Sequence, residues 1–240
     1  MNKAITPERL RLLKEFCKKA GTDFQDIELL DHAFFHRSAY NEHKKEFGGV
    51  IYNNERLEFL GDSVLGMVTA SWLFRELEDS KEGELAKIKS SVVSEKALAP
   101  MALKLGIDKL LVLGHGEEMT GGRNKPAILA DCMEAVIGAY YLDKGYRKTE
   151  EYVLSFIVPE ICKVLENGTK DFKTQLQEFS QKKFKITPEY ELLGTSGPEH
   201  EKTFRILVHV KDKKFGPVSG SSKKEAEQKA AELALKSLIS

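Results

Sequence analysis

Apolar residues return every three or four positions through most of the first 165 residues, which is the period of a helix with one buried face. Threonine, proline and glutamate at residues 6–8 are typical of a helix start, and glycines at 21 and 106 mark helix ends. Polar or glycine-rich intervals at 36–52 and 114–125 predict loops. No β-type alternation occurs in this part. We therefore expect an all-helical domain, with helices near residues 7–20, 26–35, 54–77, 85–93, 98–105, 129–143 and 149–165.

The pattern changes after Asn167-Gly168, a pair that favours a helix stop and a short joint. A strand is predicted at residues 204–210, where apolar and polar residues alternate, between two helices. We expect two domains: an all-α domain at 1–166, a linker at 167–170, and a small α+β domain at 171–240 with the order α-β-β-β-α. The expected buried positions of the second domain are Phe172, Leu176, Phe179, Phe204, Ile206, Val208, Val210, Ala226, Ala230, Leu233 and Ala234.

The helix at 54–77 carries three acids on one stripe. At about 100° per residue, Glu55, Glu58 and Asp62 share a narrow arc, although the segment around them is strongly apolar. A solvated acidic face is the ordinary explanation of such a stripe. A divalent metal is the alternative, because carboxylate oxygens are the ligands that Mg²⁺ prefers.

A second acidic pair favours the metal. Asp131 and Glu134 are again three residues apart, on a helix whose other residues are mostly apolar, and Gly138 falls on the same arc. Glycine inside a helix costs about 1 kcal/mol relative to alanine and is often explained by close approach of another backbone. Carboxylates on a buried helix need a metal or a base. Two such helices facing each other would form a cluster of four or five carboxylates.

The net charge of zero hides an asymmetry between the two parts of the chain. Residues 1–168 hold 23 Lys+Arg against 27 Asp+Glu, and residues 169–240 hold 14 against 10, so the second part is the better candidate for contact with a polyanion. We expect a cytoplasmic protein without a membrane span, since no signal peptide and no stretch of about 20 apolar residues is evident. Three distant cysteines form no zinc or redox motif and are expected to be reduced.

The motifs NERLEFLGDSVL, at residues 54–65, and LADCMEA, at 129–135, resemble the signature of the ribonuclease III family, and FFHRSAYNE and GELAKIKSSVVSEKALA agree with it. The resemblance implies a Mg²⁺-dependent endoribonuclease for double-stranded RNA, with Mn²⁺ able to replace Mg²⁺ and no small-molecule cofactor. It implies a homodimer whose two centres leave 5′-phosphate and 3′-hydroxyl ends with short 3′ overhangs. The residues implied are the metal ligands Glu58, Asp62, Asp131 and Glu134, of which Asp62 and Glu134 are the catalytic pair, and the secondary acid Glu55.

The second domain, with KTQLQEF, GPEHEKTF and SSKKEAEQKAA, resembles a double-stranded-RNA-binding domain. Such domains read a duplex by its shape over about 16 bp, and a helix N-terminus already favours phosphate. On this resemblance the RNA-binding residues are Thr174, Gln177, Glu178 and Gln181 for one minor groove, His200 for the next, and Lys223 and Lys224 for the phosphates between.

Other interpretations remain open at this stage. His36 and Ser38 lie near the catalytic valley of the family, but hydrogen bonding that stabilises the loop explains them better than a chemical role. The chain could be a scaffold that binds duplex RNA without cutting it, although a scaffold has no need of mutually repelling carboxylates. A third interpretation, hydrolysis of a small phosphate ester, leaves the second domain without a purpose.

Overall fold

A computed structural model describes residues 5–43, 53–168, 171–198 and 201–239. The chain forms two compact units, residues 1–164 and 165–240. The domain boundaries expected from the sequence, with a linker at 167–170, stay a prediction, because residues 169–170 lie outside the described part.

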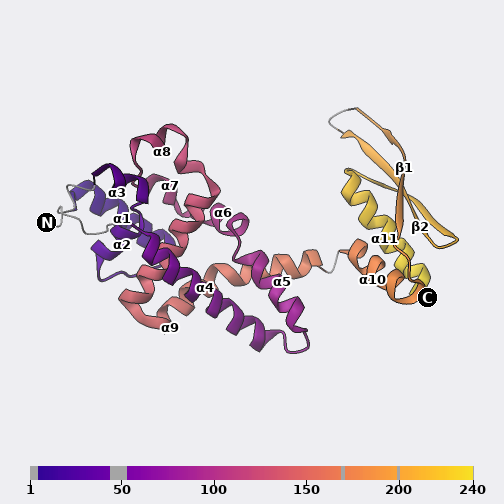
Figure 1. The fold of residues 1–240 in the computed structure, drawn as a ribbon, viewed down its shortest axis with the longest axis horizontal. Coiled ribbons are helices and arrows are strands. Elements are labelled where there is room, and N and C mark those ends of the chain that lie inside the picture. Colours follow the sequence, from indigo (N-terminus) through magenta and orange to yellow (C-terminus); the bar gives the residue numbers. More distant parts are fainter. Residues whose placement is uncertain (1–4, 44–52, 169–170, 199–200, 240) are drawn as a thin grey trace. The chain divides into compact units, whose positions relative to one another are not determined.

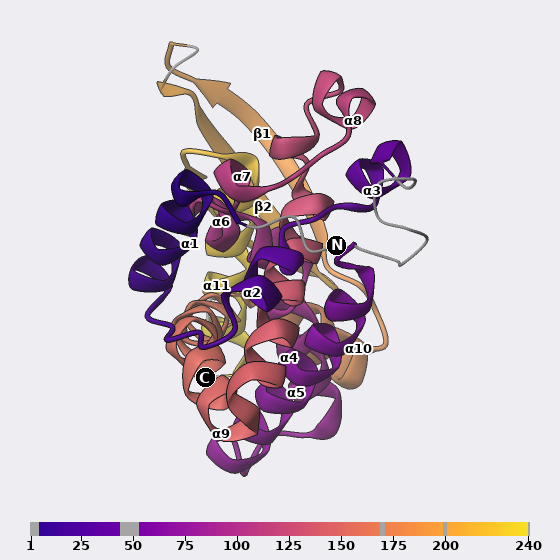
Figure 2. The same ribbon diagram turned by 90° about the vertical axis from the view of Figure 1, so that its left-hand side faces the viewer.

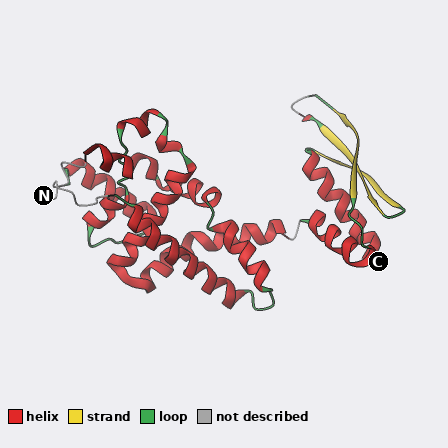
Figure 3. Cartoon of the chain, viewed as in Figure 1, coloured by secondary structure: helices red, strands yellow, loops and turns green. Residues whose placement is uncertain are grey.

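The first unit is built of helices, as Figure 3 shows, and this confirms the predicted all-α domain. Among the described residues of this unit, β-type pairing is found at an isolated bridge between Phe35 and Val112. The elements are α1 (Pro7–Ala20), α2 (Ile27–Ala33), α3 (Arg37–His43), α4 (Glu55–Glu76), α5 (Glu82–Val92), α6 (Glu95–Leu105), α7 (Ile107–Leu110), α8 (His115–Met119), the 3-10 turn η1 (Gly122–Asn124) and α9 (Pro126–Gly168).

Several predicted helix ends are present. Thr6 caps α1 by accepting a hydrogen bond from the Arg9 amide, and Gly21 ends the helix at a φ of 69°. Helix α9 is kinked at Gly145, whose φ of 75° and ψ of 179° are not helical. This kink lies close to the predicted helix stop. The loops predicted at 36–52 and 114–125 are only partly right, because they contain the short helices α3 and α8; residues 44–52 lie outside the described part.

Helices α4 and α9 lie side by side in the centre of the unit (Figures 1 and 2). Leu57, Val64 and Val68 of α4 are buried, as are Met133 and Ile137 of α9. Length and composition alone would allow α4 to cross a membrane, which was not expected from the sequence; one side of this helix is buried in the unit.

The second unit confirms the predicted order. A three-stranded antiparallel sheet, with β2 in the middle, follows α10, and α11 packs against β2 and β3 (Figure 1). Ile206, Val208 and Val210 are buried, as the alternation predicted. The prediction for Leu233 was wrong, since this residue is 39% exposed and Ala231 and Leu235 are buried instead. The elements are α10 (Phe172–Phe184), β1 (Glu189–Ser196), β2 (Thr203–Val210), β3 (Lys213–Gly220) and α11 (Lys223–Ile239).

Candidate metal centre and RNA-binding surface

Two glycines bring the acidic helices together. Gly61 of α4 and Gly138 of α9 are both buried, and a Cβ added to Gly61 would overlap the carbonyl of Glu134 and lie 3.0 Å from the amide nitrogen of Gly138. A Cβ on Gly138 would in turn overlap the carbonyl of Leu57. The close approach predicted from Gly138 is therefore present. It leaves no room for a side chain between the two helices at the level of the acids.

Three of the predicted ligands converge at this crossing. Glu58 of α4 and Asp131 and Glu134 of α9 each offer a carboxylate oxygen, and these oxygens lie within 4.8 Å of one another. All three side chains are half-buried. Asp62, one turn further along α4, is exposed and does not belong to this group, although its charge acts on Glu134.

The secondary acid Glu55 stands apart from the three. It begins α4, is exposed, and accepts hydrogen bonds from Asn53 Nδ2 at 3.0 Å and Arg37 Nη1 at 3.5 Å. Its charge nevertheless acts on Glu58.

Burial and mutual repulsion make the carboxylates hold protons strongly. Burial, followed by the charges of Asp62, Asp131 and Glu58, raises the pKa of Glu134 to about 8. Burial is also the main cause that raises the pKa of Glu58 and of Asp131; Asp131 adds to it at Glu58, and Glu95 adds to it at Asp131. Like charges in a half-buried site favour whatever cation can replace the protons.

The chemistry of this group suits a divalent metal. All three donors are carboxylates, which are the ligands of hard cations such as Mg²⁺ and Mn²⁺. Within the described parts of the chain, no ion pair joins Glu58, Asp131 or Glu134 to a base. The centre is also distinct from a cleft of the unit that lies elsewhere along α4.

Hydrogen bonds organise the segment beside the centre. The Ser38 amide donates to His36 Nδ1 at 3.2 Å, and the Ser38 hydroxyl lies 2.8 Å from the same nitrogen and accepts from the Gly114 amide at 2.9 Å. Burial lowers the pKa of His36, which agrees with a ring nitrogen that accepts. The structural role expected for His36 and Ser38 is therefore visible.

Sequence reasoning missed Arg37 and Asn53, which hold Glu55. Their positions gave a signal, because Arg37 stands between His36 and Ser38 and Asn53 opens the signature segment.

The predicted RNA-binding residues of the second unit lie on exposed surfaces of α10 and α11. Thr174 accompanies the N-cap Asp171, while Lys223 and Lys224 open α11, with the Ser222 hydroxyl accepting from the Glu225 amide. His200 falls outside the described residues. The exposed set comprises Thr174, Gln177, Glu178 and Gln181 on α10 and Lys223 and Lys224 on α11.

Family models match both units. Residues 26–161 match the model of the Ribonuclease-III-like family, and residues 172–238 match the Double-stranded RNA binding motif. Together the two matches reproduce the order of domains inferred from the motifs.

Similar proteins match along nearly the whole chain. A protein named Ribonuclease 3 from Treponema denticola is 54% identical over 237 residues, covering 98% of this chain and 95% of that protein. Another protein named Ribonuclease 3, from Nitratiruptor, is 43% identical over 230 residues, covering 95% and 98%. The nuclease domain of ribonuclease III from Campylobacter jejuni has a similar structure, with a TM-score of 0.56 and 35% identity over 62% of this chain and 97% of that one. The present chain therefore belongs to the ribonuclease III family.

Proposed function

We propose that this chain is a Mg²⁺-dependent endoribonuclease that hydrolyses phosphodiester bonds in double-stranded RNA. The observation that carries the proposal is the meeting of Glu58, Asp131 and Glu134 at one crossing of α4 and α9, in a chain that also has a double-stranded-RNA-binding unit. Its products would carry 5′-phosphate and 3′-hydroxyl ends with short 3′ overhangs, as is general for the family. Ribosomal RNA precursors, messenger and transfer RNA precursors and other structured RNAs in the cytoplasm are its proposed substrates.

The carboxylates of the first unit would hold the metal. Glu58, Asp131 and Glu134 supply three oxygens, and Asp62 completes the proposed ligand set from the exposed side of α4. When bound, Mg²⁺ supplies activation of the attacking water and relief of the charge that develops on the phosphate. Mn²⁺ can replace it, because both are hard cations that take oxygen ligands. Glu134 must give up its proton for this, and the glycine crossing keeps its carboxylate beside that of Glu58.

The second unit selects a duplex by shape. The polar face of α10 and the two lysines at the start of α11 offer hydrogen-bonding groups and positive charge, as minor-groove and phosphate contacts require. We find no set of side chains arranged to read bases among the described residues. Selection by shape explains why such an enzyme would accept many structured RNAs.

An exposed apolar stripe on α4 supports a homodimer. Phe59, Met67 and Phe74 are 78%, 48% and 75% exposed, and their spacing places them on one face of the helix, with Phe59 next to the acids. Isolated exposed apolar residues are ordinary, but several large apolar side chains on one face of a helix are typical of an interface. The Campylobacter jejuni structure concerns a region involved in dimer formation of that nuclease domain.

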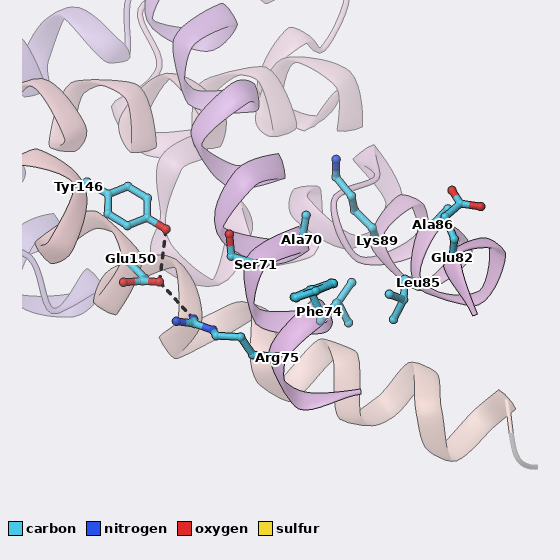
Figure 4. Close-up of a pocket in the computed structure, with 11 residues that line it drawn as sticks. Ala70, Ser71, Phe74, Arg75, Glu82, Leu85, Ala86, Lys89, Tyr146 and Glu150 are labelled. Atoms are coloured by element: carbon cyan, nitrogen blue, oxygen red, sulfur yellow. Dashed lines mark hydrogen bonds and ion pairs between the residues drawn. The ribbon is translucent and has the colours of Figure 1, made fainter. Parts of the chain in front are cut away.

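A cleft of about 840 Å³ extends the same surface at the C-terminal end of α4. Figure 4 shows Phe74 at this cleft with Leu85 and Ala86 of α5 across from it, while Arg75 and Tyr146 both contact Glu150. Apolar walls with a polar rim suit a protein surface better than a small charged substrate. We propose that a second copy of the chain covers this surface.

Cleavage of an end-labelled RNA hairpin tests the function. The protein should cut the duplex in Mg²⁺ and not in Ca²⁺, and Glu134→Gln should bind the hairpin without cutting it. Tight binding by the unaltered protein, with no cutting across metals and pH, would instead identify a scaffold that binds duplex RNA. Cutting of a small phosphate ester but not of the hairpin would overturn both.

A further inference from the structure

Arg37 stands at the edge of the carboxylate centre, directly after two residues whose backbones are held by hydrogen bonds. The preceding residue, His36, donates its amide hydrogen to the Val112 carbonyl at 3.1 Å, and the Phe35 carbonyl accepts from the Asn54 amide at 2.8 Å. The second bond ties the segment before α3 to Asn54, the residue that precedes α4, and the first ties it to Val112. The guanidinium can move, but it is tethered beside the first turn of the acidic helix.

The positive charge of Arg37 reaches the metal ligands. Its guanidinium lowers the pKa of both Glu58 and Asp131, against the raising effect of burial and of neighbouring acids. The distance of Arg37 Nη1 from the nearest carboxylate oxygen, that of Glu55, is 3.5 Å. Arg37 is thus a positive charge close enough to act on the centre, although among the described residues it forms no ion pair with a proposed metal ligand.

The contact between Arg37 and Glu55 is easy to break. The two side chains are 65% and 50% exposed, and an ion pair this long and this exposed contributes little to stability. Glu55 also accepts a hydrogen bond from Asn53 Nδ2 at 3.0 Å, so it keeps a partner if Arg37 leaves. The guanidinium is therefore free to exchange one acceptor for another.

We propose that Arg37 is a substrate-binding residue of the active centre. Its guanidinium breaks the contact with Glu55 and binds the phosphate of duplex RNA at the cleaved bond or next to it. This rests on the proposed function. The planar guanidinium matches two phosphate oxygens, and such charge-assisted bonds are among the strongest hydrogen bonds in proteins. Carboxylates neutralised by a divalent cation attract the guanidinium less, which leaves phosphate as its better acceptor. The arginine also offsets the repulsion that a phosphate meets on approaching a group of acids.

The test compares Arg37→Ala and Arg37→Lys with Arg11→Ala. Arg11 is a matched control, because its ion pair with Glu15 is similarly exposed, at 62% and 59%, and lies on α1. Three quantities are measured for each protein: kcat/KM for hairpin cleavage in Mg²⁺, hairpin affinity in Ca²⁺, and affinity for Mn²⁺ without RNA by electron paramagnetic resonance. The unaltered protein and Glu134→Gln are run in parallel, so that loss of the proposed function itself is recognised separately.

We expect Arg37→Ala to lower kcat/KM by about 10- to 100-fold, as removal of a charged hydrogen bond does. Its affinity for Mn²⁺ should be unchanged or a few-fold tighter, because a positive charge near the ligands is lost. Arg37→Lys should recover part of kcat/KM, since one ammonium cannot bind two phosphate oxygens as the guanidinium does. Arg11→Ala should match the unaltered protein.

Two results would overturn the inference. If Arg37→Ala cleaves as well as Arg11→Ala, Arg37 makes no contact that matters for the reaction. If activity and Mn²⁺ affinity fall together in Arg37→Ala, Arg37 only supports the carboxylates. Arg37→Lys replaces Arg37→Ala in this comparison if the alanine variant does not fold. A lower kcat/KM together with an unchanged or tighter Mn²⁺ affinity is a result that a merely structural role does not produce.

Discussion

Gly61 of α4 and Gly138 of α9 press the backbones of their helices together, and neither position has space for a methyl group. An added Cβ would overlap the carbonyl of Glu134, a proposed metal ligand, or that of Leu57, the residue before the ligand Glu58. The separation of the two helices, and with it the spacing of the carboxylates, is therefore set by the absence of side chains.

Gly138→Ala should consequently damage the centre as well as the fold. Overpacking costs about 1–3 kcal/mol, which exceeds the gain of about 1 kcal/mol from replacing glycine in a helix. We expect a lower free energy of unfolding in urea and a weaker affinity for Mn²⁺. Gly66→Ala on the partner helix α4 is the control, because its Cβ would meet only the flexible end of Lys89, at 3.4 Å, and should be neutral or slightly stabilising. Equal behaviour of the two variants would show that the crossing is not tight.

Glu134→Gln should stabilise the metal-free protein at high pH. The carboxyl has a folded pKa of about 8, well above its usual 4.5, so the folded state keeps a proton that the unfolded state releases between these values. The stabilising effect of this proton is complete below about pH 4.5 and is lost as pH rises through 8. Glutamine stays neutral, so its Tm should exceed that of the unaltered protein by ~5 °C at pH 8.5 and be equal at pH 4.5. A Tm difference that does not grow with pH would contradict the raised pKa.

Metal binding should release protons. Because Glu134 is still largely protonated at pH 6, a metal must displace a proton there, and the apparent Kd for Mn²⁺ should rise about tenfold for each pH unit between 7.5 and 6. Calorimetry in two buffers of different ionisation enthalpy measures the number of protons released. Glu134→Gln removes this proton and serves as the control. A Kd independent of pH would mean that Glu134 is already ionised in the free protein.

Lys223→Ala and Lys224→Ala should each weaken binding of duplex RNA without regard to its sequence. If each lysine neutralises one phosphate, the slope of log affinity against log salt should fall by about one for each substitution. Lys236→Ala is the matched control, since Lys236 is an exposed lysine of the same helix that pairs with Glu232 in its last turns. A change in affinity with an unchanged salt slope would argue against a phosphate contact.

Phe74→Asp should convert a dimer into monomers. Phe74 is 75% exposed on the apolar stripe of α4, and a buried, unpaired charge in an interface is costly. Sedimentation velocity measures the mass, and Met119→Asp, at an equally exposed residue of α8, is the control. If Phe74→Asp and the control sediment alike, this face is not the interface.

The helical pattern was sufficient to predict the acidic helices, and the arcs at 55–62 and 131–138 placed three carboxylates correctly within one group. It could not show that Asp62 would remain exposed, because the reach of each side chain depends on the angle and height at which α4 crosses α9. Periodicity describes one helix at a time. The crossing is a property of two.

Helices α3 and α8 were missed for a related reason. Their local sequences are polar and glycine-rich, but Glu42 accepts hydrogen bonds from the amides of His115 and Gly116, and Ser38 accepts from that of Gly114. Partners more than 70 residues away thus satisfy the backbone of α8. No short window of sequence contains that information, and Arg37 was overlooked in the same interval.

Helix α4 meets three environments at once: the core on one side, the carboxylate centre on another, and the exposed apolar stripe on the third. Few positions of α4 affect only one of these three environments. A substitution that suits the core can disturb an acid one turn away, and a change on the stripe lies beside the centre. In a library of random variants, α4 should therefore tolerate fewer replacements than any surface helix of the unit, and a second change that restores activity should most often lie on α9.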